Sequence, residues 1–295
     1  MNRETLAAID IGSNAIRLLI NYVEVNGSVN YKKAAFIRVP IRLGEDVFTA
    51  GEISEEKRKK MGVAMLSFAH LMNTFNVKAY RACATSAMRE AKNGAEVVQY
   101  IKEVSGINIE IISGIDEAKT IFEAGNIERF IPKDTNYIYV DVGGGSTEVT
   151  VYSGSRRVTS ESFRLGTVRT ISEGVNKAEY KEFKEWLERI ALPFKPIAII
   201  GSGGNINKSH KLLGKRDNEA IKYGELREIY DTLKVLSYEQ RIKQFGLNTY
   251  RADVIVPAMK IFLTAAKTCK IEDIIAPRIG LADGIIHQLY RSEQK

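Results

Sequence analysis

The chain has 295 residues, of which 44% are apolar and 27% charged, a composition typical of a globular protein with room for two cores. No apolar run approaches the roughly 18 residues of a membrane span, and no signal peptide precedes the first strand pattern, so we expect a cytoplasmic protein without a membrane partner. The 43 basic and 36 acidic residues leave a net charge of +7, which either attracts a polyanion or serves only solubility, and no motif indicates a nucleic-acid partner.

Apolar periodicity predicts the same run of elements twice. In the first half it predicts strands at 5–11, 15–24 and 29–39, a helix at 54–74, a strand at 77–83, helical segments at 86–104, a strand at 107–112 and a helix at 115–129. In the second half it predicts strands at 136–142, 146–152 and 156–163, a helix at 178–190, a strand at 196–201, helices at 204–213, 223–235, 237–244 and 251–267, a strand at 272–275 and a last helix at 281–291.

This repeated order predicts an α/β protein of two actin-like (ribonuclease H-like) domains with a cleft between them. Pro132 and the polar residues 133–136 mark the expected boundary, which gives domains at 1–130 and 131–280. The last helix, 281–295, is a candidate to return to the first domain.

One motif occurs in both halves, at residues 7–20 and 137–151: an apolar run, an Asp, a Gly/Ser turn and a second apolar run. Such a turn exposes backbone amides that bind anions, and the adjacent Asp suits Mg²⁺ or a water. The alternative for Asp10 or Asp141 alone is a residue that caps its own turn. The predicted phosphate-binding residues of the two turns are Gly12, Ser13 and Asn14, and Gly143, Gly144, Gly145, Ser146 and Thr147.

Two glutamates are candidates for chemistry. Glu148 follows the second turn and shares a strand face with Ser146, where it suits a metal or water; the alternative is an ordinary exposed Glu. Glu117 lies where a strand becomes a helix, and it is either a general base or an acidic residue that suits the first helical turn.

Three further segments add cations and glycines. Arg89 follows an apolar strand at the start of a helix and suits a phosphate, although a surface Arg is common in helices. Arg164, which precedes Gly166 in a segment with a second arginine, is also a predicted phosphate-binding residue. The glycines of a third Gly-rich loop, also assigned to phosphate, are Gly201, Gly203 and Gly204.

These motifs resemble the exopolyphosphatase and guanosine pentaphosphate phosphohydrolase (Ppx/GppA) family in its short, two-domain form. The matching segments are Asp10–Asn14 with Arg17, Thr85–Arg89, Ile112–Ala118, Asp141–Glu148, Arg164–Gly166 and Gly201–Gly204. The resemblance implies that Glu117 activates the attacking water. It implies that Asp141 and Glu148, with Asp10, hold Mg²⁺ or Mn²⁺, and that the two turns and Arg89 hold the terminal phosphates.

The resemblance also implies the substrate, inorganic polyphosphate or guanosine pentaphosphate, and leaves a homodimer open. Ala15 and Asp116 depart from the family's usual Ser and Glu, and longer relatives carry further C-terminal domains, which favours short polymers here. Two other hypotheses remain: a non-catalytic sensor of polyphosphate or a stringent-response nucleotide, and a sugar kinase, which shares the bare Asp-Gly turns.

Overall fold

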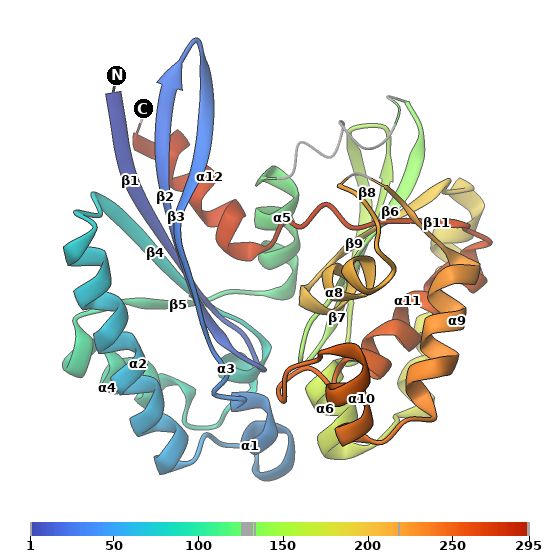
Figure 1. Cartoon of the computed structure of the whole chain (residues 1–295), viewed down its shortest axis with the longest axis horizontal. Helices are drawn as coiled ribbons and strands as arrows, with labels where there is room; N and C mark the ends of the chain where they lie inside the picture. The colour runs from blue at the N-terminus through green and yellow to red at the C-terminus, as the bar shows by residue number, and fades with distance from the viewer. Residues whose placement is uncertain (1, 125–131, 133, 218, 294–295) are drawn as a thin grey trace. The chain divides into compact units, whose positions relative to one another are not determined.

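The computed structural model describes residues 2–124, 132, 134–217 and 219–293, which divide into two compact units. Unit 1 comprises Met1–Ala124 and Gly280–Lys295, and unit 2 comprises Gly125–Ile279. Each unit has its own sheet (Figure 1). The boundary expected between residues 130 and 131, and residues 125–129 of the helix expected at 115–129, lie outside the described residues.

Unit 1 is a five-stranded sheet with helices on both faces (Figure 1). Its elements are β1 (Asn2–Ile11), β2 (Ile16–Asn26), β3 (Ser28–Val39), α1 (Leu43–Ala50), α2 (Glu55–Thr74), β4 (Ala79–Ala84), α3 (Ser86–Glu90), α4 (Gly94–Ser105), β5 (Ile109–Ile111), α5 (Gly114–Ala124) and α12 (Leu281–Glu293). The strand order is β3-β2-β1-β4-β5. The first three strands pair antiparallel, and β1, β4 and β5 pair parallel.

The core of unit 1 follows from two sequence patterns. Leu6 to Ile9 in β1 are fully buried, as expected for a central strand covered on both faces. Met61, Met65 and Phe68 recur at helical spacing and bury one face of α2, which begins at the capping residue Ser54. The last helix, α12, packs against α5 and β1.

Unit 2 repeats this plan with a six-stranded sheet. Its elements are β6 (Asn136–Val142), β7 (Thr147–Ser153), β8 (Arg156–Phe163), α6 (Thr167–Glu173), α7 (Lys177–Trp186), a π-helical turn (Leu187–Ala191), a 3₁₀ turn (Leu192–Phe194), β9 (Ala198–Ser202), α8 (Gly204–Leu212), β10 (Ile221–Lys222), α9 (Tyr223–Lys234), α10 (Tyr238–Phe245), α11 (Ile255–Cys269) and β11 (Asp273–Ile275). The sheet order is β10-β11-β9-β6-β7-β8. Its core gathers around Phe163, Phe183 and Phe262.

The two sheets share one topology. Read from β8, the second order is β8-β7-β6-β9-β11, which matches β3-β2-β1-β4-β5 strand for strand in pairing direction. The α/β fold of two actin-like domains is therefore confirmed. Within the described part of the chain, none of the helices has the length and apolar content that crossing a membrane requires.

Two short helices have no counterpart among the predicted elements. These are α1 and α6, which follow the third strand of each unit. The helix predicted at 251–267 begins later, at Ile255, because residues 249–254 form turns. The helix predicted at 178–190 is regular only to Trp186 and continues as the π-helical turn.

Candidate functional site

Asp10 occupies the end of β1 in unit 1. It lies directly opposite Arg17 in the β1–β2 ladder, and the Arg17 guanidinium forms an ion pair with its carboxylate. Asp10 is 5% exposed, whereas the Arg17 side chain is 29% exposed, so the carboxylate is buried and the guanidinium is partly open to water. A metal ion at Asp10 would compete with the guanidinium, and the place of Asp10 among the metal ligands stays a prediction.

The turn after Asp10 closes on itself. The amide of Gly12 donates to the carbonyl of Ala15 (3.1 Å), which holds Ser13 and Asn14 at the tip. Ser13 is 3% exposed, and its hydroxyl has no hydrogen-bond partner among the described residues. Because a buried hydroxyl without a partner costs free energy, an acceptor such as a phosphate oxygen would complete this turn.

Glu117 lies in the first turn of α5, with its amide donating to the carbonyl of Ser113 (3.0 Å). Cys83 in β4 is the register partner of Asp10, and its thiol is affected by the charges of both Asp10 and Glu117. Burial raises the pKa of the Cys83 thiol to about 12, and the negative charges of Asp10 and Glu117 contribute to this rise. Both carboxylates therefore lie within electrostatic reach of one buried thiol in unit 1.

Arg89 links two of the predicted segments in unit 1. It lies in α3, a helix of five residues. Its guanidinium donates to the carbonyl of Ile112 (2.8 Å), just before α5. Arg89 thus lies beside the turn that leads into the helix of Glu117.

In unit 2, Asp141 and Glu148 are register partners in the β6–β7 ladder. Directly opposed residues have Cβ atoms about 4.5–5.5 Å apart and point to the same face of the sheet. Asp141 is 7% exposed and Glu148 3%, so the sequence alternative of an exposed strand Glu is wrong. One Glu148 oxygen accepts hydrogen bonds from the hydroxyls of Ser146 (2.6 Å) and Ser162 (3.0 Å).

Helix α6 covers the carbonyls of the Gly143–Gly145 turn. The amide of Thr167 donates to Gly143 (3.1 Å), and that of Val168 to Gly144 (2.8 Å). The Thr147 hydroxyl donates in turn to the carbonyl of Leu165, just before α6. The turn is therefore fixed from the side of its carbonyl groups.

The two arginines after β8 differ in their roles. Arg169 is 3% exposed and donates from Nε to the Gly145 carbonyl (2.8 Å), so it supports the turn from within the protein. Arg164 is exposed, and its amide donates to Glu179 (2.5 Å). Of the two, only Arg164 presents an exposed side chain.

The third Gly-rich loop is positioned by close packing. Gly203 has φ +105°, and a Cβ there would lie 2.8 Å from the carbonyl oxygen of Val142 and 3.5 Å from Asp141 Oδ1. Gly201 lies within β9, and a Cβ there would meet Phe262 and Ile206, so close packing accounts for this glycine, and its assignment to phosphate stays a prediction.

Sequence reasoning missed Arg251. Its guanidinium donates to the carbonyl of Gly204, the first residue of α8. Burial lowers the pKa of Lys208, and the positive charges of Lys211 and Arg251 lower it further. Arg251 lies 47 residues from Gly204 along the chain, and no local pattern links them.

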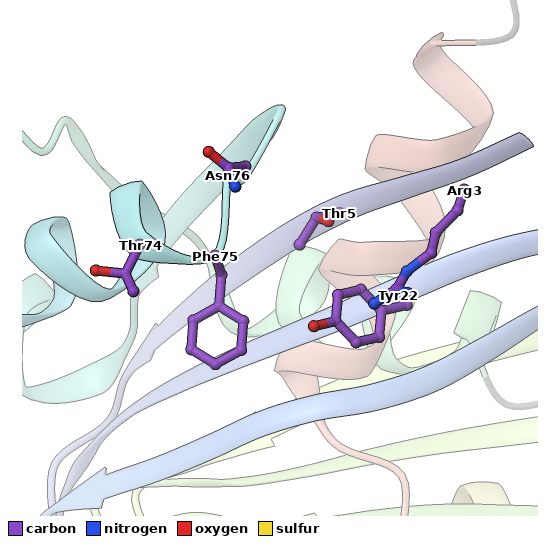
Figure 2. Close-up of a pocket in the computed structure, with 6 residues that line it drawn as sticks. All are labelled: Arg3, Thr5, Tyr22, Thr74, Phe75 and Asn76. Carbon is purple, nitrogen blue, oxygen red and sulfur yellow. The ribbon is translucent and has the colours of Figure 1, made fainter.

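A surface pocket in unit 1 lies at the other end of β1 (Figure 2). It is lined by Arg3, Thr5, Tyr22, Thr74, Phe75 and Asn76. The Arg3 guanidinium carbon lies 3.3 Å from the centre of the Tyr22 ring. The pocket contains none of the predicted site residues.

The fold and the two turns define an actin-like protein in which each domain presents a Gly/Ser turn beside a buried aspartate. The sequence model of the Ppx/GppA phosphatase family matches residues 35–293. The chain belongs to this family, and the resemblance recognised from its motifs is confirmed.

Individual relatives are distant in sequence but extend over the whole chain. A Haemophilus influenzae protein named "Putative exopolyphosphatase" is 24% identical over 307 residues, covering 99% of this chain and 94% of its own length. An Aeromonas hydrophila protein named "Guanosine-5'-triphosphate,3'-diphosphate pyrophosphatase" is 24% identical, and the match covers 98% of this chain but 60% of the relative. The crystal structure of the Aquifex aeolicus Ppx/GppA family member has a TM-score of 0.77 at 25% identity, with both chains fully covered.

Proposed function

We propose that this chain is an exopolyphosphatase, which hydrolyses the terminal phosphoanhydride bond of inorganic polyphosphate and releases orthophosphate. The observation that carries the proposal is the buried pair of Asp141 and Glu148, opposed in one ladder beside a turn of three glycines, in a member of a phosphatase family. The preference for short polymers implied by the family resemblance is part of the proposal, as is a cytoplasmic location.

Glu117 is the proposed general base, which takes a proton from the water that attacks the terminal phosphorus. The bond from that phosphorus to the bridging oxygen breaks, and the shortened polymer leaves with the bridging oxygen. The amides of the two turns and Arg89 are proposed to hold the phosphate oxygens in the bound substrate as well as in the transition state.

The residues of unit 2 fit a divalent metal. Asp141 and Glu148 are directly opposed in the ladder, so their carboxyl groups lie on one face of the sheet, where a divalent cation could bind both. Carboxylate and hydroxyl oxygens are ligands of hard cations, and Mg²⁺ is commonly bound by one or two carboxylates together with substrate phosphates. Within residues 2–124, 132, 134–217 and 219–293, no group of three or more His, Cys, Asp or Glu forms a metal cluster, and the remaining ligands are proposed to come from the substrate. Bound there, Mg²⁺ or Mn²⁺ would neutralise phosphoryl oxygens.

Metal removal gives the first prediction. We expect EDTA to abolish orthophosphate release and added Mg²⁺ or Mn²⁺ to restore it. Replacing Asp141 by Asn keeps the shape of the side chain but removes one charge, and should raise the Mg²⁺ concentration for half-maximal rate by about 10-fold or more. Ser160→Ala, on the neighbouring strand β8, is the control and should leave this concentration unchanged. Full activity in EDTA would contradict the metal proposal.

A comparison of substrates tests the proposal directly. Orthophosphate release is measured with short polyphosphate, long polyphosphate, guanosine pentaphosphate and ATP side by side. We expect the highest kcat/KM on short polyphosphate. The Aeromonas relative's name supports the second candidate, a guanosine pentaphosphate 5′-phosphohydrolase, and preference for that nucleotide would establish it instead. Phosphate transfer from ATP to a sugar would point to the kinase.

A further inference from the structure

Helix α1 and the residue before it fix the direction in which the peptide groups of the first turn, residues 12–15, point. The amide of Gly44 donates to the carbonyl of Ser13 (2.8 Å), and that of Arg42 donates to the carbonyl of Asn14 (3.1 Å). In a planar trans peptide the C=O and the following N–H point in opposite directions. The amides of Asn14 and Ala15 therefore point away from α1.

Unit 2 contains the same arrangement. Helix α6 donates amides to the carbonyls of Gly143 and Gly144, so the amides of Gly144 and Gly145 point away from α6 for the same reason. In both units the short helix that follows the third strand holds the carbonyls of the turn between the first two strands. Because both units have this arrangement, we infer that the short helix orients the amides of the turn.

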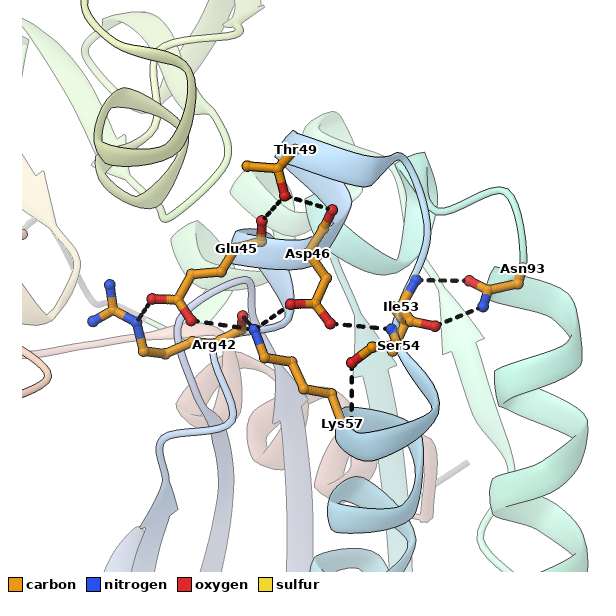
Figure 3. A network of polar contacts seen from close by, with 8 residues as sticks. All are labelled: Arg42, Glu45, Asp46, Thr49, Ile53, Ser54, Lys57 and Asn93. Carbon is orange, nitrogen blue, oxygen red and sulfur yellow. Dashed lines mark hydrogen bonds and ion pairs between the residues drawn. The ribbon is translucent and has the colours of Figure 1, made fainter.

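The start of α1 is itself held by Lys57, which lies on α2 (Figure 3). Lys57 Nζ lies 2.7 Å from the Arg42 carbonyl, 2.6 Å from Asp46 Oδ1 and 3.2 Å from Glu45 Oε2. These three contacts match the three donors of an ammonium group. The Lys57 side chain is 16% exposed and that of Asp46 is 19% exposed, so this ion pair is better shielded from water than the contact with Glu45, which is 41% exposed.

The partners of Lys57 are fixed in turn. Burial alone would raise the pKa of Asp46, but hydrogen bonds from Lys57 and Ser54 outweigh it and lower the pKa, so the carboxylate is charged at neutral pH. The Ser54 amide donates to Asp46 Oδ2 (3.0 Å). Asn93 both accepts from the Ile53 amide and donates to its carbonyl, which ties this segment to α4. Figure 3 shows these contacts as one connected network.

We propose that Lys57 is a positioning residue for phosphate binding, and this inference rests on the proposed function of the first turn. Lys57 holds the Arg42 carbonyl and the acidic first turn of α1, and α1 holds the carbonyls of Ser13 and Asn14. Through these two steps a lysine in α2 fixes the amides that meet the phosphate. In unit 2, Arg169 serves the same purpose by donating directly to Gly145.

The test compares Lys57→Met with Lys60→Met, an exposed lysine three residues further along the same helix. The first readout is hydrogen exchange at the amides of Arg42 and Gly44, which requires no activity. Exchange should accelerate at least about tenfold in Lys57→Met, because a hydrogen bond network to a charged group is lost, and stay unchanged in Lys60→Met.

The second readout is the split between KM and kcat on short polyphosphate. Lys57→Met should raise KM by about tenfold with kcat within about twofold, because the turn binds ground state and transition state alike. Lys57→Arg, which keeps the charge and several donors, should recover most of the affinity. A lower melting temperature with exchange and KM unchanged would overturn the proposal, as would equal effects in both Met variants.

Hydrogen exchange at the backbone amides needs no catalytic activity, so it tests the role of Lys57 independently of the proposed function. If the wild-type protein hydrolyses none of the substrates, the hydrolase proposal fails, while exchange and the affinity for tripolyphosphate still report on Lys57. If hydrolysis is normal but Lys57→Met leaves exchange and affinity unchanged, only the positioning role fails.

Discussion

Replacement of Glu117 by Gln is expected to slow orthophosphate release by about 10²- to 10⁴-fold, the usual contribution of a general base. The amide of Gln has nearly the same size but cannot accept the proton of the attacking water. The backbone bond from residue 117 to Ser113 does not depend on the side chain, so α5 should stay in place. Single-turnover phosphate release and substrate affinity are both measured, and the affinity should change by less than about threefold because the loss is confined to chemistry.

Asp116→Asn is the matched control for Glu117→Gln. Asp116 is the adjacent carboxylate on α5, and it accepts a hydrogen bond from the Ser113 hydroxyl (2.6 Å). We expect this variant to keep most of the wild-type rate, because Asn can still accept that bond. Equal losses in both variants would mean that negative charge near the start of α5, rather than a base at Glu117, supports the reaction.

The same experiment separates the hydrolase from the sensor. A sensor binds polyphosphate without releasing phosphate, and its affinity is unchanged in Glu117→Gln. A hydrolase shows release in the wild type that is lost in the variant. Asp141 and Glu148 are buried acidic residues beside the second turn, and a metal bound there with the phosphate is part of the hydrolase proposal. Metal-dependent hydrolysis would explain why two acidic residues are placed there.

Replacement of Gly166 by Ala is the second change with a large expected effect. A Cβ at this position would lie 2.3 Å from the carbonyl oxygen of Gly144 and 2.3 Å from the carbonyl carbon of Gly145. Both atoms belong to the backbone of the second turn, so relief of the clash must move the turn or the start of α6. Overpacking of this kind costs about 1–3 kcal/mol. Because misplacement by about 1 Å can reduce a rate about 10²-fold, phosphate release should fall by a similar factor.

Gly224→Ala is the control for Gly166→Ala. It lies in the first turn of α9 in the same unit, and nothing lies within 4 Å of a Cβ there. Ala is the better helix former by up to about 1 kcal/mol, so the variant should be neutral or slightly more stable. Urea unfolding and phosphate release are followed for both variants. If Gly166→Ala matched wild type in both measurements, the close approach of α6 to the turn would be disproved.

The sequence by itself determined the strands, the long helices and the duplicated hairpins. Short apolar runs located β1 and β2 around Asp10, and β6 and β7 around Asp141, within one or two residues of most observed bounds. Glycines in the turns and the order of motifs were sufficient to recognise the family. These signals are local: a strand's period and a turn's composition are set by neighbours in the chain.

Only the tertiary structure showed which segments hold the two turns and which partners Lys57 contacts. Helices α1 and α6 are two turns long, too short for a clear period, and their amides bond to carbonyls 20 or more residues earlier. Gly201 looks like the other loop glycines in sequence, yet it packs against Phe262. Lys57 belongs to a run of four basic residues at 57–60, and its proposed role rests on contacts with the start of α1 that only the fold creates. Such long-range contacts depend on how the sheet brings distant segments together, which no local pattern records.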